Sequence, residues 1–539
     1  MKLFKHVSTK KTPQSEPVPG KPMVPNSAGG YSFALDDWTR LERFLILGSE
    51  GGSYYATERK LTVENAATAV SCAKANGAEA VRRIVAVSDA GRAPKNDYAV
   101  FALALVAAHA DAAGKKAAYE AVPKVCRTGT HLFQFAAASN ELRGWGRGLR
   151  QAVADWYLSK DRRDLAYQIT KYQQRDGWSH RDLLRLAHPK TDDAVRNDLL
   201  GWAVGKRATD EFAATLTAVP PEGDLAPLAA LEAAKRATSD DEIVRLVRDF
   251  RLVREGVPTQ FLASAKVWEA LLDQMPLTAM LRNLATMTRV GLLTHESTAT
   301  RLVVERLTDA DRLTKARVHP LAVLVALKTY EGGKSAKGSG EWTPLKAVAN
   351  ALDDAFYLAF KAVEPTGKRW LLALDVSGSM GGGLIAGIPG VTPRVGSAAM
   401  ALVTATVEKE TTLVGFQDKL VPVKIGPGMS LDRAVKAIDG LPFGSTDCAQ
   451  PMLYALKNKL SVDTFVVYTD SETWFGDVHP FQALKQYRGQ TGIPAKLVVI
   501  GMVANKFTIA DPSDAGMLDV VGFDTTAPAV IADFARSSS

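Results

Sequence analysis

Oxygen-bearing side chains follow an apolar run near residue 375 and could bind a divalent metal ion. Residues 370–374 read Trp-Leu-Leu-Ala-Leu, and an apolar run without alternation predicts a strand buried on both faces of a parallel sheet. Asp375, Ser377 and Ser379 come next, and Gly378 allows a tight turn between them. Because ligands of open α/β sheets bind beyond the carboxyl ends of the strands, these side chains could hold a hard cation such as Mg²⁺.

Two later segments could supply the further oxygen ligands that Mg²⁺ requires. Thr446 precedes a helical run, and Asp470 ends a second apolar run at residues 464–469. The set Asp-x-Ser-x-Ser, then Thr, then Asp resembles the metal-ion-dependent adhesion site of von Willebrand factor A domains. This resemblance implies that the metal keeps one open position for an acidic group of a partner.

Other roles remain open for these acids. Asp375 and Asp470 could cap helices by accepting backbone hydrogen bonds. A phosphotransfer site is disfavoured because such loops usually carry a second acid two residues on, where this chain has Ser377. Two-metal hydrolysis also needs more carboxylates than these segments offer.

The C-terminal part, residues 366–539, alternates between apolar runs and amphipathic segments, which predicts a doubly wound, Rossmann-like α/β domain. Strands are expected at 370–375, 411–417, 463–469 and 495–502, and helices at 396–408, 430–438, 449–460, 479–488 and 528–536.

The preceding part of the chain, residues 1–365, is predicted to be mainly helical. Residues 1–29 are rich in Lys, Pro, Ser and Gly and predict a loose tail. Residues 36–48 begin with acids and end with glycine, as helices prefer. Between residues 63 and 331, Ala- and Leu-rich segments recur between short breaks, with no strand pattern. Residues 30–365 are therefore expected to form a helical-repeat solenoid of the HEAT type. The breaks are expected at Gly77, Gly91 to Pro94, Gly114, Gly129 and Pro220-Pro221, with a turn after Gly51.

Composition narrows the class of protein. The 539 residues are 46% hydrophobic, which suffices for several cores. The chain has no apolar run of membrane-spanning length and no signal-peptide pattern, so a cytoplasmic protein without a membrane partner is expected.

The charge is distributed unevenly between the two parts of the chain. Residues 366–539 contain 15 Lys and Arg against 16 Asp and Glu, which leaves 51 Lys and Arg against 42 Asp and Glu for residues 1–365. A basic helical part favours a polyanionic partner, although surplus charge can also serve solubility alone.

Basic residues gather around residues 171–188. Lys171 and Arg175 are four apart and are predicted to share one helix face. Ser179, with Asp182 three residues on, could cap the next helix. That helix would carry Arg181, Arg185 and His188 on one face, with Gln168, Gln174 and His180 nearby. Such faces could grip phosphates and sugar hydroxyls of RNA, or could simply be solvated.

Several helical segments are similar to the Ro autoantigen family, in which an RNA-binding TROVE module of HEAT-like helices joins a von Willebrand A domain. The likeness is carried by residues 146–157, 167–189, 275–284 and 313–320 and extends from about residue 31 to the end. It implies that the positions of Lys171, Arg175 and His188 hold structured small Y-type RNA on the outer surface of a ring.

A second basic group, Lys315, Arg317 and His319, precedes a hydrophobic helix and could be a helix-flanking surface cluster. The resemblance implies instead that this region lies by the ring's opening, where the single-stranded 3′ end of a defective RNA can thread. The C-terminal domain could bridge the two ends of the solenoid and so close the ring.

The sequence thus predicts a non-catalytic RNA-binding ring with Mg²⁺ in its C-terminal domain. A role in RNA quality control or processing, possibly with an exoribonuclease such as polynucleotide phosphorylase, follows from the resemblance. A protein-binding adaptor with no RNA role and a metal-dependent nuclease are the alternatives.

Overall fold

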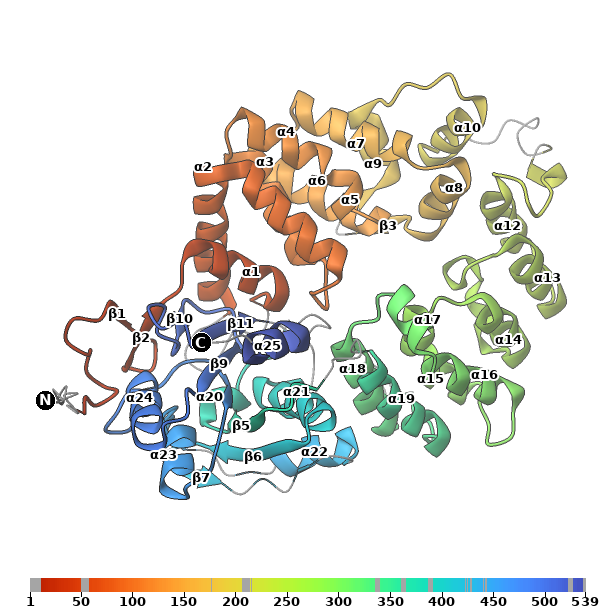
Figure 1. Ribbon diagram of the computed structural model, residues 1–539. Coiled ribbons are helices and arrows are strands. Elements are labelled where there is room, and N and C mark those ends of the chain that lie inside the picture. Colours follow the sequence, from red (N-terminus) through yellow and green to blue (C-terminus); the bar gives the residue numbers. More distant parts are fainter. Residues whose placement is uncertain are drawn as a thin grey trace, which may run out of the picture.

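The helices of the protein follow an arc, and an α/β domain lies between the two ends of that arc (Figure 1). The computed structural model describes residues 11–49, 58–175, 177–205, 214, 216–334, 340–359, 365–385, 391–421, 423, 425–426, 429–439, 441, 444–521 and 527–536. The expected fold class, a ring of helices closed by a C-terminal α/β domain, is confirmed.

The arc is built from consecutive helices with short connections. They are α1 (Asp37–Leu47), α2 (Glu58–Ala90), α3 (Asp97–His109), α4 (Ala112–Glu120), α5 (Val122–Val125), α6 (Gly129–Arg143), α7 (Arg147–Ser159), α8 (Arg162–Lys171), α9 (His180–Ala187), α10 (Ala194–Ala203), α12 (Ala226–Ala234), α13 (Asp240–Phe250), α14 (Ala265–Gln274), α15 (Leu277–Arg289), α16 (Thr298–Leu307), α17 (Ala310–Lys315), α18 (Pro320–Glu331) and α19 (Lys346–Leu358). No helix in the described ranges combines the length and apolar composition needed to cross a membrane.

Local signals set several helix boundaries correctly. Asp36 caps α1 by accepting a hydrogen bond from Thr39 N, and Gly48 ends α1 with a φ of 65°. The break expected at Gly77 is confirmed as a kink in α2, because the neighbouring Asn76 is non-helical with φ −159° and ψ 92°. Gly114, also expected as a break, lies instead inside α4. A Cβ on Gly77 would lie 2.8 Å from Gly114 Cα, so these glycines allow α2 and α4 to approach closely. The turn expected after Gly51 lies outside the described residues.

The α/β domain is built on a six-stranded sheet. Its order is β11 (Met517–Val521), β9 (Lys496–Gly501), β8 (Thr464–Thr469), β5 (Arg369–Asp375), β6 (Glu410–Phe416) and β7 (Leu420–Val421). All neighbours are parallel except β6 and β7. Strand β11 was not predicted, because its run Met-Leu-Asp-Val-Val is interrupted by an acid.

Helices cover both faces of this sheet. Alternate residues of β5 pack into two different cores, Leu372 and Leu374 into one and Leu371 and Ala373 into the other. α21 (Pro393–Val407), α22 (Leu431–Asp439) and α25 (Ala527–Arg536) pack on the first face, and α23 (Gln450–Lys457) and α24 (Pro480–Thr491) on the second. Strands buried on both sides explain the unalternating apolar runs.

The N-terminal segment belongs structurally to the α/β domain. β1 (Met23–Pro25) and β2 (Tyr31–Ala34) form a small antiparallel sheet with β10 (Phe507–Thr508). The Gln14 side chain is fully buried there and donates to Asp447 Oδ1 at 2.5 Å. The expected loose tail is therefore wrong for residues 11–29, because long-range hydrogen bonds compensate for the small apolar content of this segment; residues 1–10 lie outside the described part.

Contacts at both ends of the arc close the ring. In α1, buried Arg43 forms an ion pair with Asp519 of β11 at 2.6 Å. At the other end, Asp353 of α19 accepts a hydrogen bond from Leu431 N at the start of α22. The two ends of the arc also meet directly, since His319 Nε2 lies 3.1 Å from the carbonyl oxygen of Arg92. The expectation that the α/β domain bridges the ends of the solenoid is confirmed.

Candidate metal centre and nucleic-acid interface

The Asp-x-Ser-x-Ser loop lies at the carboxyl end of the central strand β5. Asp375, Ser377 and Ser379 are each at most 1% exposed. The hydroxyls of Ser377 and Ser379 lie 3.0 Å apart, and Thr469 Oγ1 donates to Asp375 Oδ2 at 2.6 Å. The neighbours of β5 are β6 and β8, one on each side, so this loop lies at the point where the strand order reverses.

The two other predicted ligands reach the same edge from separate loops. Asp470 follows β8 directly. Its carboxylate accepts a hydrogen bond from Ser379 and is repelled by the negative charge of Asp375. The loop carrying Thr446 contacts the first loop where Gly378 N donates to Gly444 O at 3.4 Å. All five predicted residues are therefore buried at one edge of the sheet, supplied by three loops.

The electrostatics of this site favour a cation. Burial raises the pKa of Asp375, and burial together with the charges of Asp375 and Glu472 raises the pKa of Asp470 well above its usual value. Thr446 Oγ1 and Asp470 Oδ2 are buried without a hydrogen-bond partner among the described residues. Unpaired buried oxygens are costly, and a hard cation would satisfy them. The donor set thus fits Mg²⁺.

Two further acids beside the site were not singled out from the sequence. Burial raises the pKa of Asp447 to about 6 and that of Glu472 to about 7. Glu472 Oε2 accepts hydrogen bonds from Ser27 N at 2.7 Å and Ala28 N at 3.1 Å. Their sequence signal is limited to nearness to Thr446, one residue before Asp447, and to Asp470, two residues before Glu472, because the segment that binds these acids comes from more than 400 residues away in the chain.

The first basic group is divided between a helix end, a hairpin and a second helix. α8 ends at Lys171, and Arg175 belongs to the hairpin of β3 (Gln174–Arg175) and β4 (Trp178–Ser179), where Gly177 turns the chain with a φ of 80°. The prediction that Lys171 and Arg175 share a helix face is therefore wrong, as is the expectation of no strands in this region. A tight hairpin is incompatible with continuing the helix.

The second helix of this group is positioned as predicted. Ser179 and Asp182 form a capping box at the start of α9, which confirms that prediction. Arg175, Arg181, Arg185 and His188 are all exposed. Within the described part of the chain, Arg181 and Arg185 have neither an ion pair nor a side-chain hydrogen bond. We call these four residues the hairpin–helix surface.

Two residues expected near this surface are instead structural. His180 is 3% exposed, its Nδ1 lies 2.7 Å from Tyr157 Oη, and burial lowers its pKa to about 4. Gln168 is buried and accepts a hydrogen bond from Gly129 N at 3.1 Å. Their predicted contact with phosphates or sugars is wrong, because both side chains are buried and form hydrogen bonds inside the protein, His180 with α7 and Gln168 with the start of α6.

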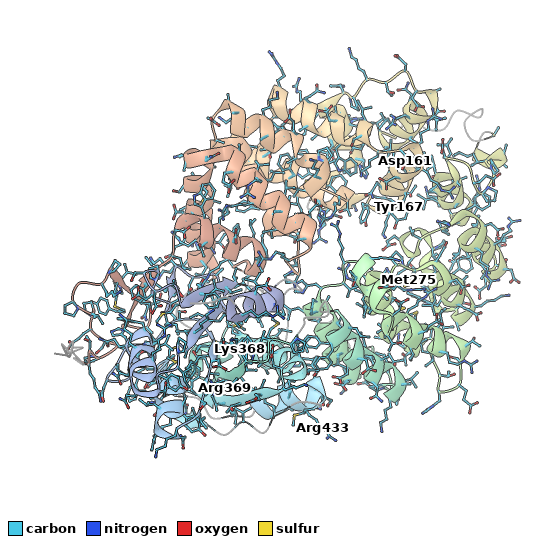
Figure 2. All side chains as sticks on the ribbon, in the orientation of Figure 1. Asp161, Tyr167, Met275, Lys368, Arg369 and Arg433 are labelled. Atoms are coloured by element: carbon cyan, nitrogen blue, oxygen red, sulfur yellow. The ribbon has the colours of Figure 1, made fainter. Side chains whose placement is uncertain are left out.

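Lys171 lines a cavity of about 420 Å³ between α8 and the α14–α15 pair. Its Nζ donates to Tyr167 Oη at 2.7 Å and lies 5.0 Å from the centre of the Tyr167 ring. Figure 2 shows Tyr167 and Met275, both lining residues, facing the inner side of the arc. Asn283, from one of the segments that resemble the Ro family, lines the same cavity.

The second basic group surrounds the start of α18. Lys315 is exposed at the end of α17, and Arg317 forms a 3.6 Å ion pair with Asp89 from the region where α2 ends. His319 is 7% exposed and caps α18, its Nδ1 accepting from Leu321 N at 3.1 Å. Since Nε2 contacts the Arg92 carbonyl, both ring nitrogens of His319 are engaged in protein contacts. A direct contact of His319 with RNA is therefore not supported, and its role is to join the ends of the arc.

Comparison with known proteins agrees with this architecture. Residues 24–329 match the family model described as the TROVE domain, and residues 369–535 match the one described as the Ro60 vWA domain. The chain belongs to the Ro60 family. It is 43% identical over 539 residues to the RNA-binding protein RO60 of Deinococcus radiodurans, covering 99% of both chains.

A second relative and a solved structure extend the comparison. The RNA-binding protein RO60 of Caenorhabditis elegans is 37% identical over 580 residues, covering 95% of this chain and 90% of that protein. The crystal structure of the Deinococcus radiodurans RO (RSR) protein superposes with a TM-score of 0.70 at 44% identity, covering 93% of this chain and 99% of that one. The family resemblance inferred from the sequence is thus confirmed along the whole chain.

Proposed function

We propose that this protein is an RNA-binding ring that holds structured small noncoding RNA, of the Y type, on the hairpin–helix surface. The observation that carries the proposal is the exposure of Arg175, Arg181, Arg185 and His188 on one hairpin and the helix that follows it. Exposed arginines bind phosphate oxygens through two parallel hydrogen bonds, and within the described part of the chain Arg181 and Arg185 have no side-chain partner to displace. Both RO60 relatives carry the name RNA-binding protein.

A second RNA contact is proposed at Lys315 and Arg317, for single-stranded 3′ ends. Both side chains are exposed beside the junction of the arc's two ends. Single strands are bound through phosphate charge and base stacking, and a narrow basic passage excludes a stiff duplex.

The α/β domain is proposed to bind Mg²⁺ through Asp375, Ser377, Ser379, Thr446 and Asp470. The metal would supply positive charge to the two buried carboxylates and a site for an acidic group of a partner. The protein's own residues fix that site, because the three loops are tied to one another by backbone hydrogen bonds such as Trp474 N to Thr446 O at 3.2 Å.

In the cell, the protein is proposed to act without catalysis in the quality control or processing of noncoding RNA in the cytoplasm. An exoribonuclease such as polynucleotide phosphorylase is a proposed partner, since a ring that holds RNA ends can present them to a nuclease.

The test measures two variants against two RNAs by gel-shift titration at several salt concentrations. The triple variant Arg175→Gln, Arg181→Gln, Arg185→Gln should weaken binding of a stem-loop and lower its salt slope by about one unit for each phosphate that is no longer neutralised. The double variant Lys315→Gln, Arg317→Gln should weaken binding of an RNA with a 3′ tail and spare the stem-loop. Arg301→Gln, exposed on α16, is the control.

Equal losses by both variants for both RNAs would mean one general basic surface and would refute the two-site proposal. Unchanged binding by both variants would refute RNA binding at these residues altogether.

A protein-binding adaptor is the second candidate, favoured by one observation at the metal face. Phe475 is 42% exposed, and its backbone N–H donates to Thr446 O at 3.1 Å. An apolar ring beside a carboxylate-binding metal would suit a protein partner. Partner capture that survives ribonuclease but is lost in Asp375→Ala and Phe475→Ala would support this function, and capture unaffected by either change would exclude it.

A further inference from the structure

A cavity of about 580 Å³ lies where the two ends of the helical arc meet. One wall comes from Val87 and Ser88 at the end of α2, from Gly91 and residues 93–96 between α2 and α3, and from Arg127, which precedes α6. The opposite wall comes from α15 and from residues 317–330. Because these walls come from distant parts of the chain, no local pattern could have indicated the cavity.

The charged side chains described in the lining of this cavity are all basic. Its lining includes Lys95, Arg127, Arg282 and Arg317, and no Asp or Glu is present among its described lining residues. Burial, and after it the charge of Arg317, lowers the pKa of Arg127. Asp89 lies outside the lining and pairs with Arg317 at 3.6 Å, but both side chains are more than half exposed, so this pair offsets little of the charge. Like charges held around a hollow space favour an anion.

Most of the remaining lining is apolar and suits a flat organic group, and Ser88, Asn96, Thr278, His319 and Thr329 add polar groups. The apolar part consists mainly of Val87, Pro94, Leu281, Leu284, Val325 and Ala326. The volume of the cavity falls within the range of about 300–1,000 Å³ typical of small-molecule sites. Arginine also matches phosphate geometry, because its planar group donates two parallel hydrogen bonds.

We infer that this cavity binds a nucleoside phosphate, with the phosphate at the arginines and the base against the apolar wall. Two sources share this chemistry: a free nucleotide, or the terminal nucleotide of an RNA strand. Only the second source rests on the proposed RNA-binding function.

Occupancy would also act on the ring. The ligand would contact residues from both ends of the arc at once, alongside the contact between His319 and Arg92. A ligand that binds only the closed arrangement stabilises it, by a free energy that rises with the logarithm of the ligand concentration above the dissociation constant. Nucleotide binding should therefore slow amide hydrogen exchange in residues 87–96 and 317–330.

The experiment is calorimetric titration of the full-length protein with uridine 5′-monophosphate, uridine and inorganic phosphate. Uridine 5′-monophosphate should bind more tightly than either of its parts. Arg282→Gln should weaken it by about tenfold or more, as expected for one charge-assisted contact. Arg289→Gln, on the same helix and outside the lining, is the matched control and should bind as wild type does.

A second variant keeps every charge but fills the space. Ala322 is an exposed lining residue at the start of α18, so Ala322→Phe should fold normally and exclude the nucleotide. Equal binding of uridine and its monophosphate, equal losses in Arg282→Gln and Arg289→Gln, or undiminished binding by Ala322→Phe would each overturn the inference.

Competition identifies the source. If an RNA with a free 3′ tail displaces uridine 5′-monophosphate, the site takes RNA ends, whereas failure to displace it assigns the site to a free nucleotide. If wild type binds the nucleotide and no RNA at all, the proposed RNA function fails while the cavity site stands.

Discussion

The ion pair that fixes the first helix to the α/β domain should be a principal contribution to ring closure. Arg43 is 1% exposed, and its Nη2 donates to both carboxylate oxygens of Asp519, at 2.6 and 2.8 Å. Nη1 donates to Asn505 Oδ1 at 2.9 Å and to Phe507 O at 3.1 Å. A Cβ on Gly501 would lie 2.6 Å from Arg43 Cζ, so the guanidinium fits directly against the end of β9.

Arg43→Met keeps much of the side-chain length and removes these four hydrogen bonds. Breaking a buried ion pair from one side costs about 3–5 kcal/mol, because the other charge is left unpaired. The Asp519 side chain is 12% exposed and keeps a hydrogen bond from Thr508 Oγ1, so solvent and Thr508 compensate in part. We therefore expect the free energy of unfolding to fall by about 3 kcal/mol, the lower end of that range.

Urea denaturation of wild type, Arg43→Met, Asp519→Asn and the double variant would measure this energy and its coupling. The double variant should lose less free energy of unfolding than the sum of the losses of the two single variants, because no unpaired charge remains in it. A loss below about 0.5 kcal/mol in Arg43→Met, the level of a neutral surface change, would refute the reasoning. So would strictly additive losses, since they would mean that the two side chains do not interact.

Three further predictions concern the metal site and the buried polar groups. Mg²⁺ at about 100 times its dissociation constant should raise the stability of wild type by about 2.7 kcal/mol; thermal melting of Asp375→Ala should show no such response, and an equal response would remove this residue from the site. Gln14→Ala should cost about 1–3 kcal/mol, because buried Asp447 and Thr473 lose a partner, and should weaken Mg²⁺ binding in calorimetry; wild-type stability would show that the N-terminal segment does not support the site. His180 has its pKa lowered from 6.5 to about 4 by burial, so its contribution to stability is complete above pH 6.5 and falls by up to about 1.4 kcal/mol per pH unit towards pH 4. Urea titrations across this range should show a shallower pH dependence for His180→Gln, and parallel curves would contradict the assignment.

The sequence predicted the positions of the candidate metal ligands better than those of the basic residues. The candidate ligands follow strand ends, and parallel strands bring their carboxyl ends to one edge of the sheet whatever the rest of the chain does. The positions of the basic residues were harder to predict, because the pattern of a helix does not show at which residue the helix ends. Thus Lys171 and Arg175 were placed on one face, whereas the turn at Gly177 puts Arg175 on a hairpin.

The roles of two histidines could not be predicted from the sequence either. His180 and His319 lie among arginines in the sequence, yet both are buried and hydrogen-bonded inside the protein. Their neighbours in space, Tyr157 and Arg92, lie 23 and 227 residues away in the chain. Composition could not separate a histidine that binds phosphate from one that holds the core.

By itself, the sequence determined the class of each half of the chain, the cap of α1, the capping box at Ser179 and the five candidate metal ligands. These features depend on hydrophobic period and on hydrogen bonds between residues a few positions apart, so they can be read from short stretches. Only the tertiary structure decided that residues 11–34 belong to the α/β domain, that Arg43 joins α1 to β11, and that Arg127, Arg282 and Arg317 surround one cavity. Such contacts join segments hundreds of residues apart, and their energies appear only when the ring closes and excludes water from both partners.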